Sequence, residues 1–390
     1  KTKMNIPFGK PNIGNEELRQ IKSVLNSGQL VHGEKTRSFE NSFKKLVGGG
    51  YATSLSSCTA GLHLSYIALG IGKGDEVLVP ALSHVATVHS VEYVGAKPIF
   101  LDAETETGNI KLSEIEKKIN NKTKALCIVH YLGLPLNMER VLQICKKYNL
   151  FLIEDCALAL GARYKGKHVG LFGDVGSFSF YPVKHITTAE GGMTISKKKS
   201  IINKLEKLKA FGYDKTLQDR KIPGKYGVDI LGYNFRMNEI EAAIGFEQLK
   251  KFPTFFRKRL SNMKVYKRLL SNNKFLKIID NDDKSATNSY YCATVILNKK
   301  IKNNRDLVLK NLIKSGIGCS IYYPGPIPAY KFYKEKYKVS MKEFKGADLI
   351  SNCSIALPLG PHVTNDNVKF ICKKLEEIVV SLSKWSLKVK

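Results

Sequence analysis

The sequence has no run of 18 apolar residues, so it predicts no membrane-spanning helix. It opens without an apolar signal region, and none of its eight cysteines form a Cys-x-x-Cys pair. Zinc-finger spacing, internal repeats and low-complexity linkers are also missing. From these absences we expect a reduced, cytoplasmic protein without a metal site.

Acidic residues are scarce, with 34 Asp and Glu against 63 Lys and Arg, and the formal net charge is +29. Such a charge suggests nucleic-acid binding, but the basic residues are spread along the chain in short runs such as 197–199. No aromatic-interleaved basic stripe appears. We therefore favour no nucleic-acid partner. The two remaining interpretations are a solvated lysine-rich surface and a field that gathers phosphorylated or nucleotide-linked anions.

With 390 residues, of which 43% are apolar, the chain is long enough for two domains. Between residues 50 and 200, short apolar runs alternate with helical patterns. The expected strands are 76–81, 97–102, 125–131, 150–155, 176–181 and 193–196, and the expected helices are 59–70, 112–120 and 138–148. This alternation predicts an α/β fold with a mainly parallel sheet sandwiched by helices.

The pattern turns helical over 238–251, and Pro253 follows. Beyond it we expect a strand over 289–297 and amphipathic helices over 305–315 and 366–382. We therefore divide the chain into a large domain, 1–250, and a smaller α+β C-terminal domain, 251–390.

Two chemically active residues stand at the ends of apolar strands. Asp155 ends the run 150–155, and Lys184 follows the aromatic strand 177–181. Ligands of parallel sheets lie beyond the carboxyl ends of the strands. A pyridoxal phosphate site needs an amine that forms a Schiff base and a carboxylate that keeps the pyridine nitrogen protonated. Considered singly, Asp155 could equally form a salt bridge, and Lys184 is one lysine among many.

Hydroxyl groups and a histidine extend this candidate site. Ser57, Cys58 and Thr59 precede a helix, where free backbone N–H groups can bind a phosphate, although an ordinary helix cap looks the same. His84 could stack on a cofactor ring or simply cap a helix, and Ser179 could face a phosphate or lie on a polar strand face. The order of these residues supports the cofactor interpretation.

Over nearly its whole length the chain resembles the DegT/StrS family of sugar aminotransferases, which have the aspartate aminotransferase fold (pyridoxal phosphate-dependent transferase fold type I). The most specific matches are Glu154-Asp155-Cys156-Ala157 and the run from Ser179 to Gly192. The segment 232–239, Gly-Tyr-Asn-Phe-Arg-Met-Asn-Glu, resembles the family segment that reaches the neighbouring subunit's cofactor.

This resemblance implies pyridoxal 5'-phosphate as cofactor, Lys184 as its Schiff-base lysine and the residue that moves protons, and Asp155 as partner of the pyridine nitrogen. It implies that His84 stacks on the ring and that the phosphate lies among Ser57, Cys58, Thr59 and Ser179. It also implies that Asn234 reaches the phosphate of a partner chain, so that the active unit is a homodimer.

The implied reaction moves an amino group, with glutamate as the expected donor, to a keto group of a nucleotide-linked sugar, and polysaccharide biosynthesis is the implied setting. Two positions depart from the family pattern: Leu158 replaces Gln or His near the cofactor's phenolic oxygen, and Pro328 replaces a common histidine. Leu158 cannot donate a hydrogen bond. The alternatives are therefore a small phosphorylated ketone as acceptor, or a non-catalytic regulator with this fold.

Overall fold

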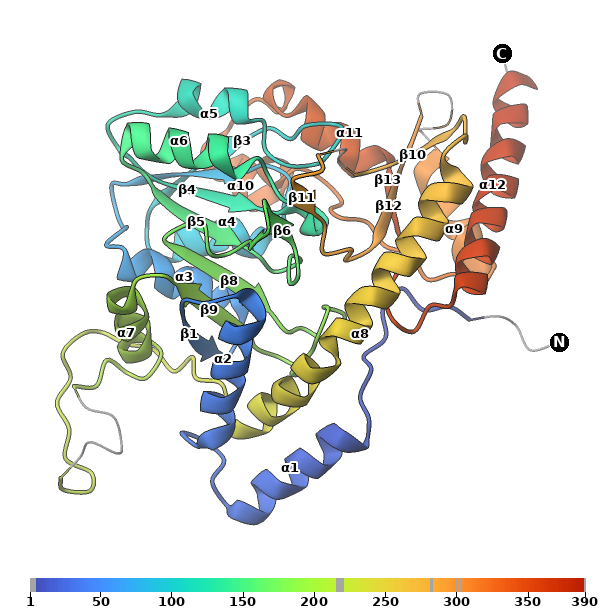
Figure 1. Ribbon diagram of the computed structural model, residues 1–390. Coiled ribbons are helices and arrows are strands. Elements are labelled where there is room, and N and C mark those ends of the chain that lie inside the picture. The colour runs from blue at the N-terminus through green and yellow to red at the C-terminus, as the bar shows by residue number, and fades with distance from the viewer. Residues whose placement is uncertain (1–4, 215–220, 281–282, 299–300, 302–303, 389–390) are drawn as a thin grey trace.

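The computed structural model describes residues 5–214, 221–280, 283–298, 301 and 304–388 (Figure 1). Its α-helices are α1 (Asn15–Ser27), α2 (Glu34–Val47), α3 (Cys58–Ala68), α4 (Val85–Tyr93), α5 (Leu112–Lys118), α6 (Met138–Tyr148), α7 (Lys199–Leu208), α8 (Glu239–Leu270), α9 (Arg305–Lys314), α10 (Lys331–Tyr337), α11 (Lys345–Cys353) and α12 (Asn365–Lys388). Short 3₁₀ helices within the described residues include η1 (Tyr131–Gly133), η3 (Ile327–Ala329) and η4 (Met341–Glu343).

The strands are β1 (Tyr51–Leu55), β2 (Glu76–Pro80), β3 (Lys97–Leu101), β4 (Thr123–Val129), β5 (Phe151–Asp155), β6 (Arg163–Tyr164), β7 (Lys167–His168), β8 (Val175–Ser179), β9 (Gly192–Ser196), β10 (Leu276–Ile278), β11 (Ala286–Thr287), β12 (Ala293–Leu297) and β13 (Ser354–Leu357). The strands expected from the sequence between residues 76 and 196 are thus confirmed to within a few residues. The strands that were not predicted from the sequence are β1, β6, β7, β10, β11 and β13.

A seven-stranded sheet forms the body of the protein, in the order β1-β9-β8-β5-β4-β2-β3. The pairs β8-β5, β5-β4, β4-β2 and β2-β3 are parallel, and β9 is antiparallel to both of its neighbours. The α/β class with a mainly parallel sheet is therefore confirmed. The carboxyl ends of β5 and β8 lie side by side, and they carry Asp155 and Ser179.

Successive side chains along each strand point to opposite faces of this sheet and are buried on both. Val77, Cys127 and Ile153 pack with the residues of α3 and α4, whereas Leu126 and Leu152 pack with those of α5 and α6. Figure 1 shows α5 and α6 together along one side of the sheet. Both faces are covered, which explains why the strands have nearly continuous apolar sequences.

A second, three-stranded sheet, β10-β12-β13, has its own apolar core with residues from α8, α9 and α12. The expected end of the helix near Pro253 is wrong, because α8 continues through Pro253 to Leu270. Pro253 lacks the N–H of a helical residue. Phe252 and Phe255 beside it are buried, and their packing holds the helix together. Figure 1 shows α8 as a long rod that runs from the large sheet to the small one.

Ile327, Tyr333 and Ile350 pack in the core of the large sheet, although they come from the C-terminal third of the chain. The division at residue 250 therefore remains a proposal about domains. The described residues between α7 and α8, 209–214 and 221–238, include a part that extends away from the body of the protein (Figure 1). Within the described residues, no helix combines the length and the apolar character that crossing a membrane requires.

Candidate active site

Asp155 is 5% exposed at the end of β5, and its carboxylate is held by two donors. Thr87 donates its hydroxyl to Oδ2 at 2.7 Å, and the Ala157 N–H donates to Oδ1 at 3.0 Å. The Ser83 and Thr87 hydroxyls are in turn 2.7 Å apart. A buried carboxylate needs such partners to stay ionised. The chain therefore fixes the position of this carboxyl group.

Lys184 lies in the loop after β8, and its amine has no carboxylate partner within 4 Å among the described residues. Its Nζ lies 5.5 Å from the centre of the Tyr291 ring. Burial lowers the pKa of the Lys184 amine, and the nearby Cys58 and Asp155 partly oppose this shift. The amine is thus more readily deprotonated than a surface lysine, as a nucleophile or general base must be.

The N-terminus of α3 presents free donors to the same region. Ser57 caps the helix by accepting the Ala60 N–H at 3.0 Å, and Gly61 N–H binds the Ser57 carbonyl at 3.1 Å. The N–H groups of Cys58 and Thr59 have no acceptor among the described residues. Burial raises the pKa of the Cys58 thiol; Asp155 raises it further, and Lys184 lowers it. The Cys58 thiol thus senses the charges of both residues.

Two glycines let α3 approach the sheet. A Cβ at Gly61 would lie 2.3 Å from the Thr194 hydroxyl, and one at Gly192 would lie 2.5 Å from the Cys58 nitrogen. Gly192 pairs with Ser179 across β8 and β9. The start of α3 and the end of β8 are therefore neighbours, which brings the predicted phosphate residues together.

His84 is the N-cap of α4, where its Nδ1 accepts the Ala86 N–H at 3.2 Å. Its ring meets Tyr323 edge-on at 5.8 Å. Burial lowers the pKa of His84, Asp155 opposes this, and Lys184 adds to it. Since Nδ1 already accepts a hydrogen bond, this lowered pKa favours a neutral ring. His84 thus caps a helix and also lies in the site.

Glu154, next to Asp155, is fully buried and faces the opposite side of β5. Its Oε2 accepts from His130 Nε2 at 2.9 Å and from the Gly170 N–H at 2.7 Å. Its Oε1 accepts from the N–H groups of Phe172 and Gly173 at 2.8 and 2.6 Å. Burial would raise its pKa, but these hydrogen bonds lower the pKa of Glu154. The side chain fixes the loop 170–173 beside the site.

Three predicted residues stand apart from this cluster. Asn234 is exposed, and its side chain makes no hydrogen bond within the described part of the chain. Leu158 is 4% exposed in the apolar core, and its carbonyl accepts the Ser289 hydroxyl at 2.6 Å. Pro328 is buried in η3. The sequence analysis missed Thr87, Tyr291 and Tyr323; only the spacing of Thr87, one helical turn after His84, could have indicated it.

Comparisons with known proteins agree with this geometry. Residues 11–376 match the DegT/DnrJ/EryC1/StrS aminotransferase family. The chain belongs to this family. Among curated relatives, the GDP-perosamine synthase of Escherichia coli O157:H7 is 35% identical over 374 residues, which cover 95% of this chain and 98% of that protein. The enzyme of the same name from Vibrio cholerae is 33% identical over 371 residues, which cover 94% of this chain and 97% of that protein.

Two solved structures are similar along their whole length. Helicobacter pylori PseC, an aminotransferase involved in the biosynthesis of pseudoaminic acid, is 29% identical with a TM-score of 0.89 and coverage of 96% of this chain and 98% of that chain. The PLP form of the putative sugar aminotransferase Spr1654 from Streptococcus pneumoniae is 26% identical with a TM-score of 0.89 and coverage of 98% and 99%. The protein is thus an aminotransferase of the pyridoxal phosphate-dependent type.

The side chains fit this cofactor. Pyridoxal phosphate needs an amine, a carboxylate and phosphate donors. The chain offers them as the unpaired Lys184, the oriented Asp155 and the free N–H groups at the start of α3. The cofactor chemistry predicted from the sequence is therefore confirmed for the family, whereas the role of each residue remains a proposal.

Proposed function

We propose that the protein transfers the amino group of glutamate to a keto group of a nucleotide-linked sugar. The observation that carries the proposal is the convergence of Lys184, Asp155 and the open start of α3 in a chain whose relatives include GDP-perosamine synthases. The surplus of positive charge supports an anionic, nucleotide-linked acceptor. When bound, pyridoxal phosphate carries the amino group and withdraws electrons from the carbon that loses a proton.

In this proposal Asp155 binds the protonated pyridine nitrogen, and Thr87 and the Ala157 N–H hold its carboxylate in place. Lys184 moves a proton at the reacting carbon of donor and acceptor, for which its lowered pKa prepares it. The backbone N–H groups of Cys58 and Thr59 bind the phosphate, with the hydroxyls of Ser57, Thr59 and Ser179 nearby. His84 lies against the ring as a neutral imidazole.

The proposed active unit is a homodimer. Exposed apolar side chains gather in the segment between α7 and α8: Leu231 is 84% exposed, Val228 60% and Ile222 56%. Monomers rarely expose such groups together, and interfaces often use them. Asn234, from the same segment, would then reach the partner's phosphate. By light scattering, we expect twice the chain mass for the wild type and a monomer for Leu231→Asp. Leu307→Asp, which changes a 43% exposed leucine on α9, should remain dimeric.

A mass-spectrometric assay tests the reaction. Purified protein is loaded with pyridoxal phosphate and incubated with glutamate and a panel of nucleotide-linked keto sugars and small phosphorylated ketones. We expect an aminated nucleotide sugar as product. Amination of the small ketones alone would favour the alternative acceptor, and no amination together with no visible cofactor absorbance would favour the regulator.

Lys184→Ala should abolish turnover, whereas Lys198→Ala, at an exposed lysine paired with Asp174, should keep it. Borohydride reduction of the loaded wild type should attach the cofactor mass to the peptide that contains Lys184. Normal turnover by Lys184→Ala, or labelling of another peptide, would refute the assignment.

A further inference from the structure

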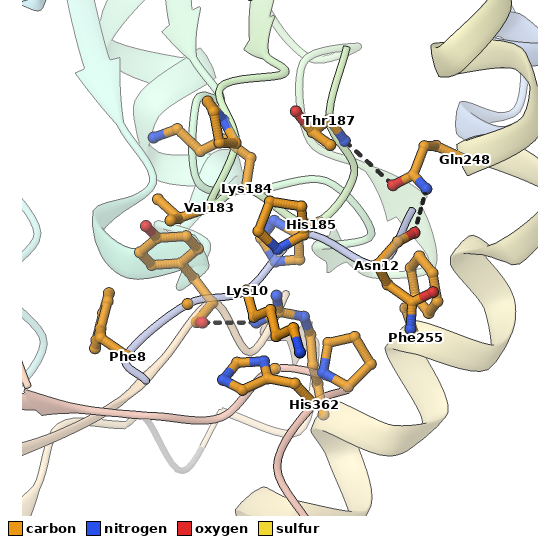
Figure 2. Close-up of a pocket in the computed structure, with 17 residues that line it drawn as sticks. Phe8, Lys10, Asn12, Val183, Lys184, His185, Thr187, Gln248, Phe255 and His362 are labelled. Atoms are coloured by element: carbon orange, nitrogen blue, oxygen red, sulfur yellow. Dashed lines mark hydrogen bonds between the residues drawn. The ribbon is translucent and has the colours of Figure 1, made fainter. Parts of the chain in front are cut away.

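A hollow open to solvent lies beside the loop that carries Lys184, and the space within it, open solvent included, is about 430 Å³. The N-terminal residues 8–12, the loop 182–187, α8 and residues 360–362 line it (Figure 2). Its walls contain the cations Lys10, Lys184 and Arg259 and the imidazoles of His185 and His362, but no Asp or Glu. Figure 2 shows the Lys184 amine pointing away from Lys10 and His362. The positive lining is therefore additional to the catalytic lysine.

Arg259, on α8, is 5% exposed and has no carboxylate partner within the described residues. Its Nη1 donates to the carbonyls of Tyr290 and Tyr291 at 3.1 and 2.7 Å, and its buried Nε has no hydrogen-bond partner there. Burial lowers the pKa of Arg259 to about 10, so the guanidinium is still charged at neutral pH. A buried cation without a counter-charge is costly, and a bound anion would remove that cost.

His362 presents a second unsatisfied nitrogen to the same space. Its Nε2 lies 2.9 Å from the Pro7 carbonyl, which can only accept, so Nε2 carries a hydrogen. Its buried Nδ1 has no partner among the described residues. A Cβ at Gly360 would lie 2.8 Å from this Nδ1 and 3.5 Å from Arg259 Nη2. A side chain at position 360 would therefore press against the His362 ring beside Arg259, so the approach of both nitrogens to the pocket depends on glycine there.

We propose that this pocket is a binding site for a small anion, a carboxylate or an inorganic oxyanion, held by Arg259, His362 and Lys10. The planar guanidinium offers paired donors that suit such oxygens. His362 can donate from Nδ1 only when it is protonated, so anion binding takes up a proton there. Burial lowers the pKa of His362, the Pro7 carbonyl opposes this, and Arg259 and Lys10 add to it; a bound anion offsets the field of the two cations. The site depends on these side chains alone and is independent of the proposed amino transfer.

Isothermal titration calorimetry on the cofactor-loaded protein tests the site, because the loaded cofactor then covers the phosphate donors of α3. Inorganic phosphate and acetate are titrated separately at constant ionic strength. We expect saturable binding of at least one, with an affinity that rises as the pH falls from about 8 to 6, the range in which histidine titrates. Binding of acetate alone identifies a carboxylate site, and binding of phosphate alone identifies an oxyanion site.

The variants localise the binding. Arg259→Gln should weaken it at least about tenfold, as expected for the loss of one charge-assisted hydrogen bond. Gly360→Ala, which presses a methyl group against the His362 ring beside Arg259 and keeps every charge, should abolish it. Arg257→Gln makes the same charge change at an exposed residue of α8 and should leave the affinity unchanged.

If the Arg259→Gln protein does not fold, Lys10→Gln tests the site instead. Lys10 is exposed, and its replacement should weaken anion binding several-fold. No saturable binding by the wild type, or equal affinities for wild type and Gly360→Ala, would overturn the proposal. A failed amino-transfer assay would leave these results unaffected.

Discussion

Replacing Glu154 by glutamine should destabilise the protein severely, although the two side chains have almost the same shape. The carboxylate accepts four hydrogen bonds, two at each oxygen, from His130 and from the N–H groups of Gly170, Phe172 and Gly173. Glutamine keeps one oxygen and presents an NH₂ group in place of the other. Two of the four donors then lose their acceptor and face another donor.

The expected cost follows from those two lost bonds. A hydrogen bond to a charged group contributes about 1.5–3 kcal/mol, so two contribute about 3–6 kcal/mol. This is a large share of the typical 5–15 kcal/mol of stability, given as an order of magnitude. Urea unfolding of the cofactor-free protein at pH 7, followed by circular dichroism, measures the loss. The control is Glu139→Gln, at a 56% exposed side chain paired with Lys165, which should cost less than about 1 kcal/mol.

The stability loss caused by Glu154→Gln should also depend on pH. Because the hydrogen bonds lower the pKa of Glu154 in the folded state, its contribution is complete above the unfolded value of 4.5. This contribution to stability is lost as the pH falls through the lower pKa that Glu154 has in the folded protein. The difference in stability between wild type and Glu154→Gln should therefore shrink below pH 4.5. A loss at pH 7 below about 1 kcal/mol, no larger than that of an exposed pair, would refute the assigned role of the four bonds.

Two further predictions concern the site itself. In the cofactor-free protein, the pH midpoint for acetylation of Lys184, followed by peptide mass spectrometry, should lie below 10.5. Because Asp155 raises that pKa, Asp155→Asn should lower the midpoint further, and an unchanged or higher midpoint contradicts the coupling. Gly192→Ala should weaken pyridoxal phosphate binding at least about tenfold in a fluorescence titration, since its Cβ would meet the Ser57 and Cys58 backbone at 2.4–2.5 Å. Gly72→Ala, whose Cβ meets only the Val94 carbonyl at 3.5 Å, should bind normally, and equal affinities of the two variants would contradict the steric argument.

The sequence predicted those elements of the fold that depend mainly on residues close together in the chain. Strands buried on both faces have short apolar runs that differ from helical patterns, so β2 to β5 could be placed to within two residues. Pro253 misled the prediction because intrinsic preference argues for a helix end there. The packing of Phe252 and Phe255 overrides that preference, and only tertiary structure reveals it.

Asp155 and Lys184 could be proposed from the sequence because Asp155 ends an apolar strand and Lys184 follows one. Thr87 and Tyr291 escaped because no local pattern connects them to residues 68 and 107 positions away. They join the site only when α4 and the segment before β12 fold against the large sheet. Residues that orient or surround a candidate catalytic group can therefore be identified only from the structure, even when the group itself can be proposed from the sequence.

The net charge of +29 shows the same limit, because composition treats all 63 basic residues alike. Lys209 and Arg259 are both buried, at 9% and 5% exposure. Lys209 lies 3.0 Å from Glu206 and 3.8 Å from Glu40, so its charge is balanced within the chain. Arg259, within the part of the chain that the structure describes, has only carbonyl oxygens as partners. Burial is costly for both cations, and the difference in partners makes Lys209 a structural residue and Arg259 the candidate for a ligand.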